Sequence, residues 1–103
     1  MIPGLKHATA HVNGIRMHYV EAGDGPPVIL LHGFPETWFC WRHQIPVLAK
    51  HFRVIAPDLR GYGATTKAPD GYDKRTMATD IRELMRHLGI ERCPIVGLSL
   101  IHI

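Results

Sequence analysis

The sequence contains little cysteine and no long hydrophobic run. Its two cysteines, Cys40 and Cys93, lie far apart in 103 residues, which favours a reducing compartment over a disulfide framework. No apolar stretch approaches the ~20 residues that are needed to cross a bilayer. The first residues, MIPGLKHATAHVNG, lack the apolar core of a signal peptide. We therefore expect a cytoplasmic protein that does not bind membranes.

An excess of one charge is also missing. Twelve Lys and Arg stand against nine Asp and Glu, and the basic residues form no stripe. Proteins that bind nucleic acid usually carry such a stripe or patch, so we expect no nucleic-acid partner. Three of the eight histidines, His7, His11 and His18, lie near one another in the sequence, but their spacing matches no zinc motif. We expect no metal site, and we expect these histidines to lie on the surface.

The sequence does contain a series of short apolar segments in a composition typical of one globular domain, 46% hydrophobic and 20% charged. Two β-type runs flank Asn13-Gly14, a dipeptide that suits the type I′ turn of a hairpin. Residues 28–31 are apolar without alternation, which predicts a strand that is buried on both faces, as in a parallel sheet. Residues 52–56 are predicted as the next strand, and residues 93–97 as another short buried strand.

Two helices are predicted between these strands. Residues 38–50 look helical, although Pro46 removes a backbone donor and could kink the segment. The second helix has one apolar stripe, with Asp73 placed to cap its start and Gly89 to end it; the stripe consists of Met77, Ile81, Leu84, Met85 and Leu88. The order of a hairpin followed by β-α-β-α-β predicts an α/β fold with a parallel sheet.

Three loops follow the three predicted parallel strands, and each carries polar or small residues. They read HGFPETW, DLRGYG and GLSL. Because ligands of open α/β sheets bind beyond the carboxyl ends of the strands, we expect these loops to share one rim. The glycines of the second loop resemble a dinucleotide fingerprint, but the third glycine and the following helix are missing. We therefore expect no cofactor.

The segments VILLHGFPETWFCWRHQIPVLA, VIAPDLRGYG and YDKRTMATDIRELMRHLGIERCPIVG resemble the N-terminal part of α/β-hydrolase-fold enzymes. HGFPE and DLRGYG are most similar to the corresponding loops of epoxide hydrolases and of haloacetate and haloalkane dehalogenases. The resemblance runs from about residue 10 to Gly97. It implies that residues 1–97 are the N-terminal part of a truncated hydrolase domain. It also implies a small-molecule substrate, an epoxide or a halogenated acid, that is attacked by an aspartate to give an alkyl-enzyme ester.

The resemblance assigns roles to the first two loops. The backbone N–H of Phe34 is expected to donate to the oxyanion of the transition state. The substrate pocket is expected to be lined by His32, Gly33, Pro35 and Trp38. The second loop is expected to be structural, a local hydrogen-bonded brace on an exposed loop that involves Asp58, Arg60 and Gly61. Trp38 could equally pack in the core, where Trp41 is expected.

The end of the sequence is interpreted separately. Gly97-Leu98-Ser99-Leu100-Ile101 is one residue short of the G-x-S-x-G nucleophile elbow, and a β-branched Ile101 would collide with the strand there. In the epoxide hydrolases and dehalogenases that the chain resembles, the position of Ser99 holds aspartate. LSLIHI is also the translation of ctg-tct-ctt-ata-cac-atc, the end of a transposon adapter used for sequencing libraries. Residues 98–103 are therefore interpreted as a non-native tail, and Ser99 as marking the position of the nucleophile.

Two alternatives remain open. One is a serine esterase or lipase-like hydrolase in which Ser99 is the nucleophile. The other is a non-catalytic binding protein that has lost its active site. On the leading interpretation, the acid and histidine of the triad and a cap domain belong to later parts of a parent protein, so the 103-residue chain is expected to be poorly soluble and inactive.

Overall fold

A five-stranded mixed sheet with helices on both faces forms the structure, a computed structural model that describes residues 4–33 and 36–97. The strands are β1 (Lys6–Val12), β2 (Ile15–Ala22), β3 (Pro27–Leu31), β4 (Arg53–Pro57) and β5 (Ile95–Gly97). Their order in the sheet is β1-β2-β4-β3-β5. The helical elements are η1 (Trp38–Trp41), α1 (Gln44–Leu48) and α2 (Lys74–His87). The predicted α/β fold is confirmed.

The β1–β2 hairpin has the predicted turn. Asn13 and Gly14 both have positive φ, 47° and 80°, as a type I′ turn requires, and Val12 pairs with Ile15 across it. β2 then pairs antiparallel with β4, while β3 is parallel to both β4 and β5. The hairpin thus extends one edge of the parallel part of the sheet, which consists of β4, β3 and β5.

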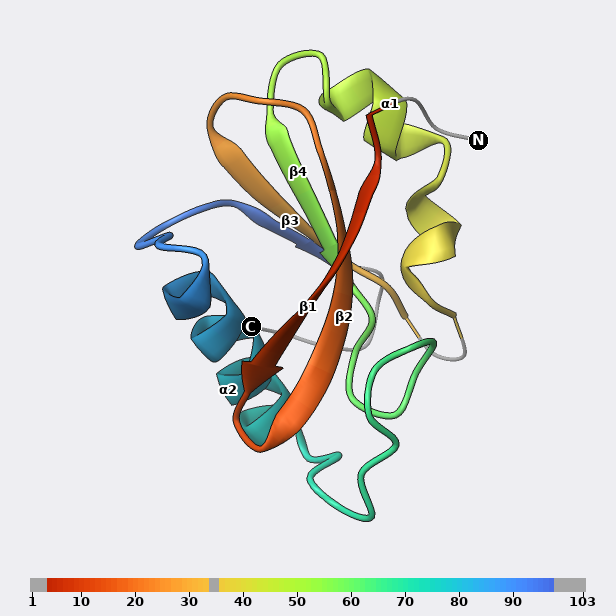
Figure 1. The fold of residues 1–103 in the computed structure, drawn as a ribbon, viewed down its shortest axis with the longest axis vertical. Helices are drawn as coiled ribbons and strands as arrows, with labels where there is room; N and C mark the ends of the chain where they lie inside the picture. Colours follow the sequence, from red (N-terminus) through yellow and green to blue (C-terminus); the bar gives the residue numbers. More distant parts are fainter. Residues whose placement is uncertain (1–3, 34–35, 98–103) are drawn as a thin grey trace.

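The helices cover opposite faces of the sheet, with α2 on one side and η1 and α1 on the other (Figure 1). Alternate side chains of the central strands feed the two cores. Ile29 and Ile55 pack towards α2, against Ile81 and Leu84. Leu30 and Val54 pack towards η1 and α1, in a cluster that also contains Trp41, which lies in the core as expected. Strands buried on both faces explain the continuous apolar runs.

The helix predicted over residues 38–50 is broken into η1 and α1, which corrects the prediction. Thr37 caps η1 through its hydroxyl, which accepts from the Phe39 N–H. Pro46 is the third residue of α1, a position in the first turn where a backbone N–H has no partner within the helix. Pro46 therefore causes no kink, because it lies in the first turn of α1 and no hydrogen bond within the helix is lost.

Helix α2 matches its prediction at both ends. The Asp73 carboxylate accepts from the Thr76 hydroxyl at 2.8 Å and from the Thr76 N–H at 3.0 Å, and these hydrogen bonds lower the pKa of Asp73. At the other end, Gly89 has φ +74°. The N–H of Gly89 donates to the Arg86 carbonyl and that of Ile90 to the Met85 carbonyl, which is a Schellman motif. None of the described helices is long and apolar enough to cross a membrane.

A buried ion pair joins the second loop to α2 and the hairpin. Arg60 donates to both carboxylate oxygens of Asp80, at 2.9 and 2.8 Å, and the side chains of both are less than a tenth exposed. The Asn13 amide also donates to Asp80 at 2.8 Å. The hydrogen bonds to Asp80 raise the pKa of Arg60. Three segments that are distant in sequence therefore depend on one charged contact.

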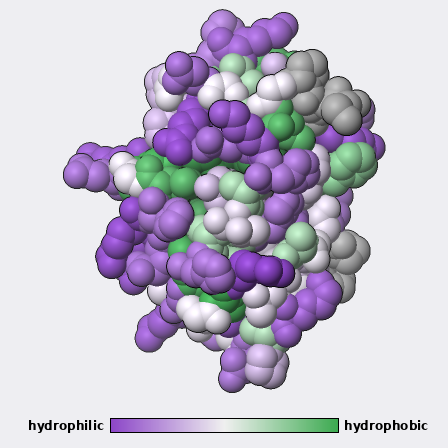
Figure 2. Space-filling model, viewed as in Figure 1, coloured by the Kyte–Doolittle hydropathy of each residue, from purple (hydrophilic) through white to green (hydrophobic). Residues whose placement is uncertain are grey.

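Strand β5 lies at an edge of the sheet. Within residues 4–33 and 36–97 it pairs only with β3, and Val96 is 45% exposed. Residues 93–97 are therefore not a fully buried strand in this chain, because no described element covers the outer side of β5. Figure 2 shows a mostly hydrophilic face, on which hydrophobic residues are exposed beside the protruding loop that precedes β5. An open edge beside exposed apolar surface favours self-association.

We predict that the 103-residue chain self-associates through β5 and that Val96→Lys raises its monomer fraction, because a charge on an edge strand opposes edge-to-edge pairing. Size-exclusion chromatography with light scattering measures this fraction. Val47→Lys is the matched control, since Val47 is 60% exposed but belongs to α1. An equal gain from both variants would contradict a role of the edge.

We also predict that Arg60→Met lowers the free energy of unfolding by about 3–5 kcal/mol, because it leaves the Asp80 carboxylate buried without its cation. Urea denaturation followed by tryptophan fluorescence gives the value. The double variant Arg60→Met/Asp80→Leu removes both charges and should recover most of the loss. Additive losses in the double variant would show that the ion pair itself is not responsible.

Candidate functional site

The loops after β3 and β4 meet at the carboxyl ends of these parallel strands, as the sequence predicts. His32 follows β3 and Asp58 follows β4, and both side chains lie between the two loops. The end of β5 is also beside this edge, because Gly97 pairs with Leu31 of β3. The three predicted loops therefore start from neighbouring points of one edge.

His32 links the two loops with both of its ring nitrogens. The residue is 1% exposed. Its Nε2 accepts from the Leu59 backbone N–H at 2.9 Å, so Nδ1 carries the proton and donates to the Gly33 carbonyl at 3.0 Å. Burial lowers the pKa of His32, against the opposing effect of the Gly33 carbonyl. His32 is therefore a neutral imidazole that fixes the start of the first loop.

The Asp58 carboxylate accepts hydrogen bonds from three segments of the chain. It is 1% exposed, and its Oδ1 accepts from the Trp38 N–H at 2.8 Å. Its Oδ2 accepts from the Ala64 N–H at 3.1 Å and from His18 Nδ1 at 2.8 Å. Three donors from three segments thus satisfy a carboxylate that would be costly to bury alone.

His18 corrects the expectation that the hairpin histidines lie on the surface. It is 9% exposed, and its Nε2 is 3.0 Å from Nδ1 of His7. His7 is exposed, and its ring meets that of Trp38 edge to face, with centroids 5.6 Å apart. His11 is exposed, as expected. His18 is buried because β2 is covered on both faces. Its place on a strand of the hairpin therefore did not mean that its side chain points to solvent.

The second loop continues the hydrogen bonding of β2 beyond the end of β4. The Asp58 N–H donates to the His18 carbonyl, and the Thr66 N–H to the Arg16 carbonyl. Thr65 completes the contact, because its hydroxyl donates to the Asp58 carbonyl at 2.6 Å and accepts from the His18 N–H at 2.9 Å. The backbone of this loop is therefore held by hydrogen bonds to β2, as a neighbouring strand would be.

Asp58 and Arg60 do not form the local brace on an exposed loop that was expected. Both are buried, and each binds partners from other segments. Gly61 lies against the ring of Tyr72, which leaves no room for a side chain. Gly63 has φ +54°, and a Cβ there would overlap the Asp58 carboxylate. The glycines thus allow the loop to close over the buried acid.

The other predicted site residues are placed as follows. Gly33 is buried, and its carbonyl accepts from the Glu36 N–H at 2.8 Å. Trp38 is half-buried and packs against the cluster on the η1 and α1 side. Phe34, Pro35 and Ser99 lie outside the described residues, as does the rest of residues 98–103.

Three residues of these networks were not among the predicted site residues, namely His18, Thr65 and Asp80. Asp80 had a usable signal, because it lies three residues after Met77 and one before Ile81, on the apolar stripe of α2. An acid at such a position needs a buried partner. Thr65 and His18 had no comparable signal, since their roles depend on which loop lies beside β2.

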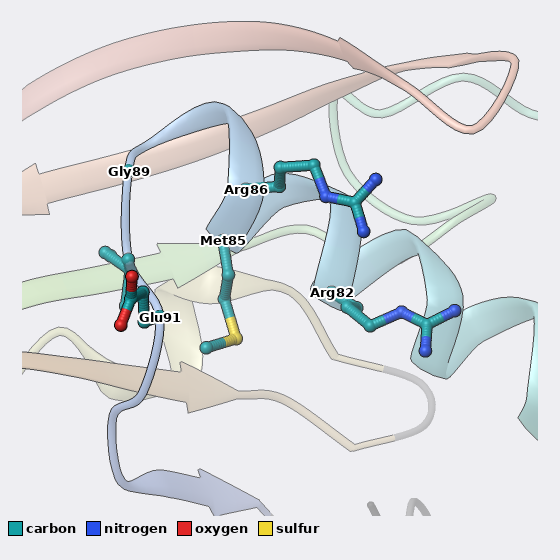
Figure 3. Close-up of a pocket in the computed structure, with 6 residues that line it drawn as sticks. Arg82, Met85, Arg86, Gly89 and Glu91 are labelled. Atoms are coloured by element: carbon teal, nitrogen blue, oxygen red, sulfur yellow. The ribbon is translucent and has the colours of Figure 1, made fainter.

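Two shallow depressions lie on α2, away from the two loops. One, of about 440 Å³, is bounded by Arg82, Met85, Arg86 and the turn from Gly89 to Glu91. Figure 3 shows the Met85 side chain beside this turn and the two guanidinium groups extending away from it. The other, of about 470 Å³, extends to Arg75. Within the described part of the chain, no three His, Cys, Asp or Glu residues are grouped to hold a metal ion.

Known proteins are similar to this chain in sequence and in fold. The chain is 56% identical over 93 residues to a soluble epoxide hydrolase of Corynebacterium sp. (strain C12), covering 90% of the chain and 32% of that protein. It is 43% identical over 102 residues to a fluoroacetate dehalogenase of Burkholderia sp., covering 94% of the chain and 34% of that protein. The solved epoxide hydrolase CorEH without ligand matches with a TM-score of 0.89 and 56% identity, over 90% of this chain and 33% of that one.

The chain therefore spans about a third of the length of these relatives. The model of the alpha/beta hydrolase fold family matches residues 26–100, which include both loops of the site and the strands β3, β4 and β5. The match covers well over half of the sequence, and the chain belongs to the α/β-hydrolase fold family.

Proposed function

We propose that this chain is the N-terminal part of an epoxide hydrolase, and that it builds the frame of the active site rather than the whole of it. The observation that carries the proposal is the pair of loops HGFPE and DLRGYG, joined by His32 and Asp58 at the carboxyl edge of the sheet. The 56% identity to a soluble epoxide hydrolase, against 43% to a fluoroacetate dehalogenase, favours an epoxide over a haloacid as the substrate.

The proposed reaction has two steps. An aspartate at the position of Ser99 attacks a ring carbon of the epoxide, the carbon–oxygen bond breaks, and the ring oxygen takes up a proton from an acidic group of the complete protein. The product of this step is an ester between substrate and enzyme. A water that is activated by a histidine then attacks the carbonyl carbon of the ester, which releases a diol and restores the carboxylate. No cofactor or metal takes part in either step.

The residues of this chain serve the second step. The tetrahedral intermediate carries an oxyanion, which the backbone N–H of Phe34 stabilises on this proposal. His32 holds the Gly33 carbonyl and Asp58 holds the Trp38 N–H. A donor that is fixed before the charge develops gives most of this kind of stabilisation, and these two contacts support the proposed role of the loop.

Neither His18 nor His32 is suited to be the general base. Both ring nitrogens of His32 are engaged with backbone groups, and those of His18 are engaged with Asp58 and His7. We propose that the base, the acid that orients it and the nucleophile belong to the complete protein, and that this protein is cytoplasmic. Residues 98–103 are then a translated adapter that follows Gly97.

A haloacid dehalogenase is the second candidate, since the fluoroacetate dehalogenase matches 94% of this chain. The same carboxylate would displace halide from carbon and give the same kind of ester. A serine hydrolase in which Ser99 is the nucleophile is the third, because the family match continues to Leu100.

We predict that the complete gene encodes aspartate at position 99, and that its product hydrolyses styrene oxide faster than fluoroacetate or p-nitrophenyl acetate. The 103-residue chain should hydrolyse none of them, because the triad is incomplete. Steady-state assays with the three substrates and the nucleotide sequence around codon 98 give the answer. Serine at position 99 together with ester hydrolysis would support the serine enzyme instead.

We further predict that the first turnover of styrene oxide in H₂¹⁸O gives a diol without ¹⁸O when the complete enzyme is in excess. The added oxygen then comes from the aspartate carboxylate, whereas later turnovers transfer labelled oxygen. Mass spectrometry of the diol after one turnover measures this. Full labelling in the first turnover would mean that water attacks the epoxide directly and that no ester forms.

A further inference from the structure

We propose that His7 is a positioning residue that acts through His18 and Asp58 on Trp38, at the start of η1. This proposal rests on the proposed function, because Trp38 ends the loop HGFPETW, from which the oxyanion donor is expected. His7 is exposed on β1, whereas His18 and Asp58 are buried. A residue at the surface of the hairpin is thereby connected to the interior of the candidate site.

The contact between the two histidines is an in-line hydrogen bond. The nitrogens are 3.0 Å apart, the ring centroids 5.2 Å, and the ring planes differ by 23°. A ring nitrogen lies less than one bond length from its own centroid, so these two distances place both nitrogens nearly on the line between the ring centres. The imidazoles therefore meet edge to edge, which is the geometry of a directed N–H···N bond.

The direction of each proton follows from the buried end of the chain. The Asp58 carboxylate only accepts, so His18 Nδ1 must donate to it. In neutral His18, Nε2 then carries a lone pair and accepts from His7 Nδ1–H. Without His7, this nitrogen of a buried ring has no donor, and the ring loses the contact that fixes its orientation.

Asp58 passes this constraint to Trp38. Its Oδ1 accepts from the Trp38 N–H at 2.8 Å, and the ring of His7 also touches the indole of Trp38. His7 thus reaches the same residue by a direct ring contact and by a chain of hydrogen bonds. At the other end of the segment, His32 Nδ1 donates to the Gly33 carbonyl. One chain of contacts thus holds the Trp38 N–H, and the other holds the Gly33 carbonyl.

The matched variants are His7→Leu and His7→Asn, studied in the complete product of the gene. The side-chain nitrogen of asparagine occupies a position equivalent to Nδ1 of histidine and can donate, whereas leucine has a similar shape and cannot. His11→Leu is the control, since His11 is exposed on the same strand.

The first measurement is amide hydrogen exchange by NMR, which does not depend on the substrate. His7→Leu should accelerate exchange at the Trp38 amide and leave that of Ile55, in the middle of β4, unchanged. His7→Asn should restore the slow exchange, and His11→Leu should have no effect. Unchanged exchange at Trp38, equal acceleration at both amides or failure of the asparagine variant to restore it would overturn the proposal.

The second measurement is steady-state hydrolysis of styrene oxide. His7→Leu should lower kcat about tenfold with little change in KM, less than the roughly 10²–10³-fold loss when an oxyanion donor is removed. An unchanged kcat, or a change in KM alone, would show that His7 does not serve the reaction. If the protein hydrolyses no substrate, the proposed function fails, while the exchange measurement still tests the hydrogen-bonded chain.

Discussion

A buried carboxylate that needs several donors is the constraint on which the site depends. Asp58 lies at the end of a central strand, out of contact with water. Its partners come from the hairpin, from the start of η1 and from its own loop. Because an unpaired buried charge costs several kcal/mol, none of these segments can move away without a large loss. The need to satisfy Asp58 thereby fixes the relative positions of three parts of the chain.

Arg60 extends this constraint to the other side of the sheet. Two residues after Asp58, its guanidinium binds Asp80 of α2 and the Asn13 carbonyl at the tip of the hairpin. The loop therefore holds the hairpin at two points, near His18 and at the turn. Burying two charged residues is tolerated because each one finds donors or acceptors that are themselves held by secondary structure. The DLRGYG loop therefore connects the helical layers on the two faces of the sheet, and it is more than a local turn.

The features predictable from sequence were those that depend on local physics. The Asn-Gly turn, the Asp73 cap and the Gly89 end of α2 each follow from the conformations that few residue types adopt. The interruption between η1 and α1 was missed, because propensity does not show where a short helix restarts. The networks of His18 and Thr65 were missed for a different reason. They depend on the loop after β4 lying beside β2, and no residue pattern within either segment predicts that pairing.

The same physics suggests why epoxide hydrolases and a fluoroacetate dehalogenase share this third of their length with the chain. On the mechanism proposed above, the two reactions differ in the first step, where a carbon–oxygen or a carbon–halogen bond breaks. On the same proposal they converge on hydrolysis of an alkyl-enzyme ester, for which an oxyanion donor must be held rigidly. The loops joined by His32 and Asp58 are proposed to serve this common step. Selection for one substrate or the other would then act on groups that contact the leaving atom, and the frame described here could remain the same in both.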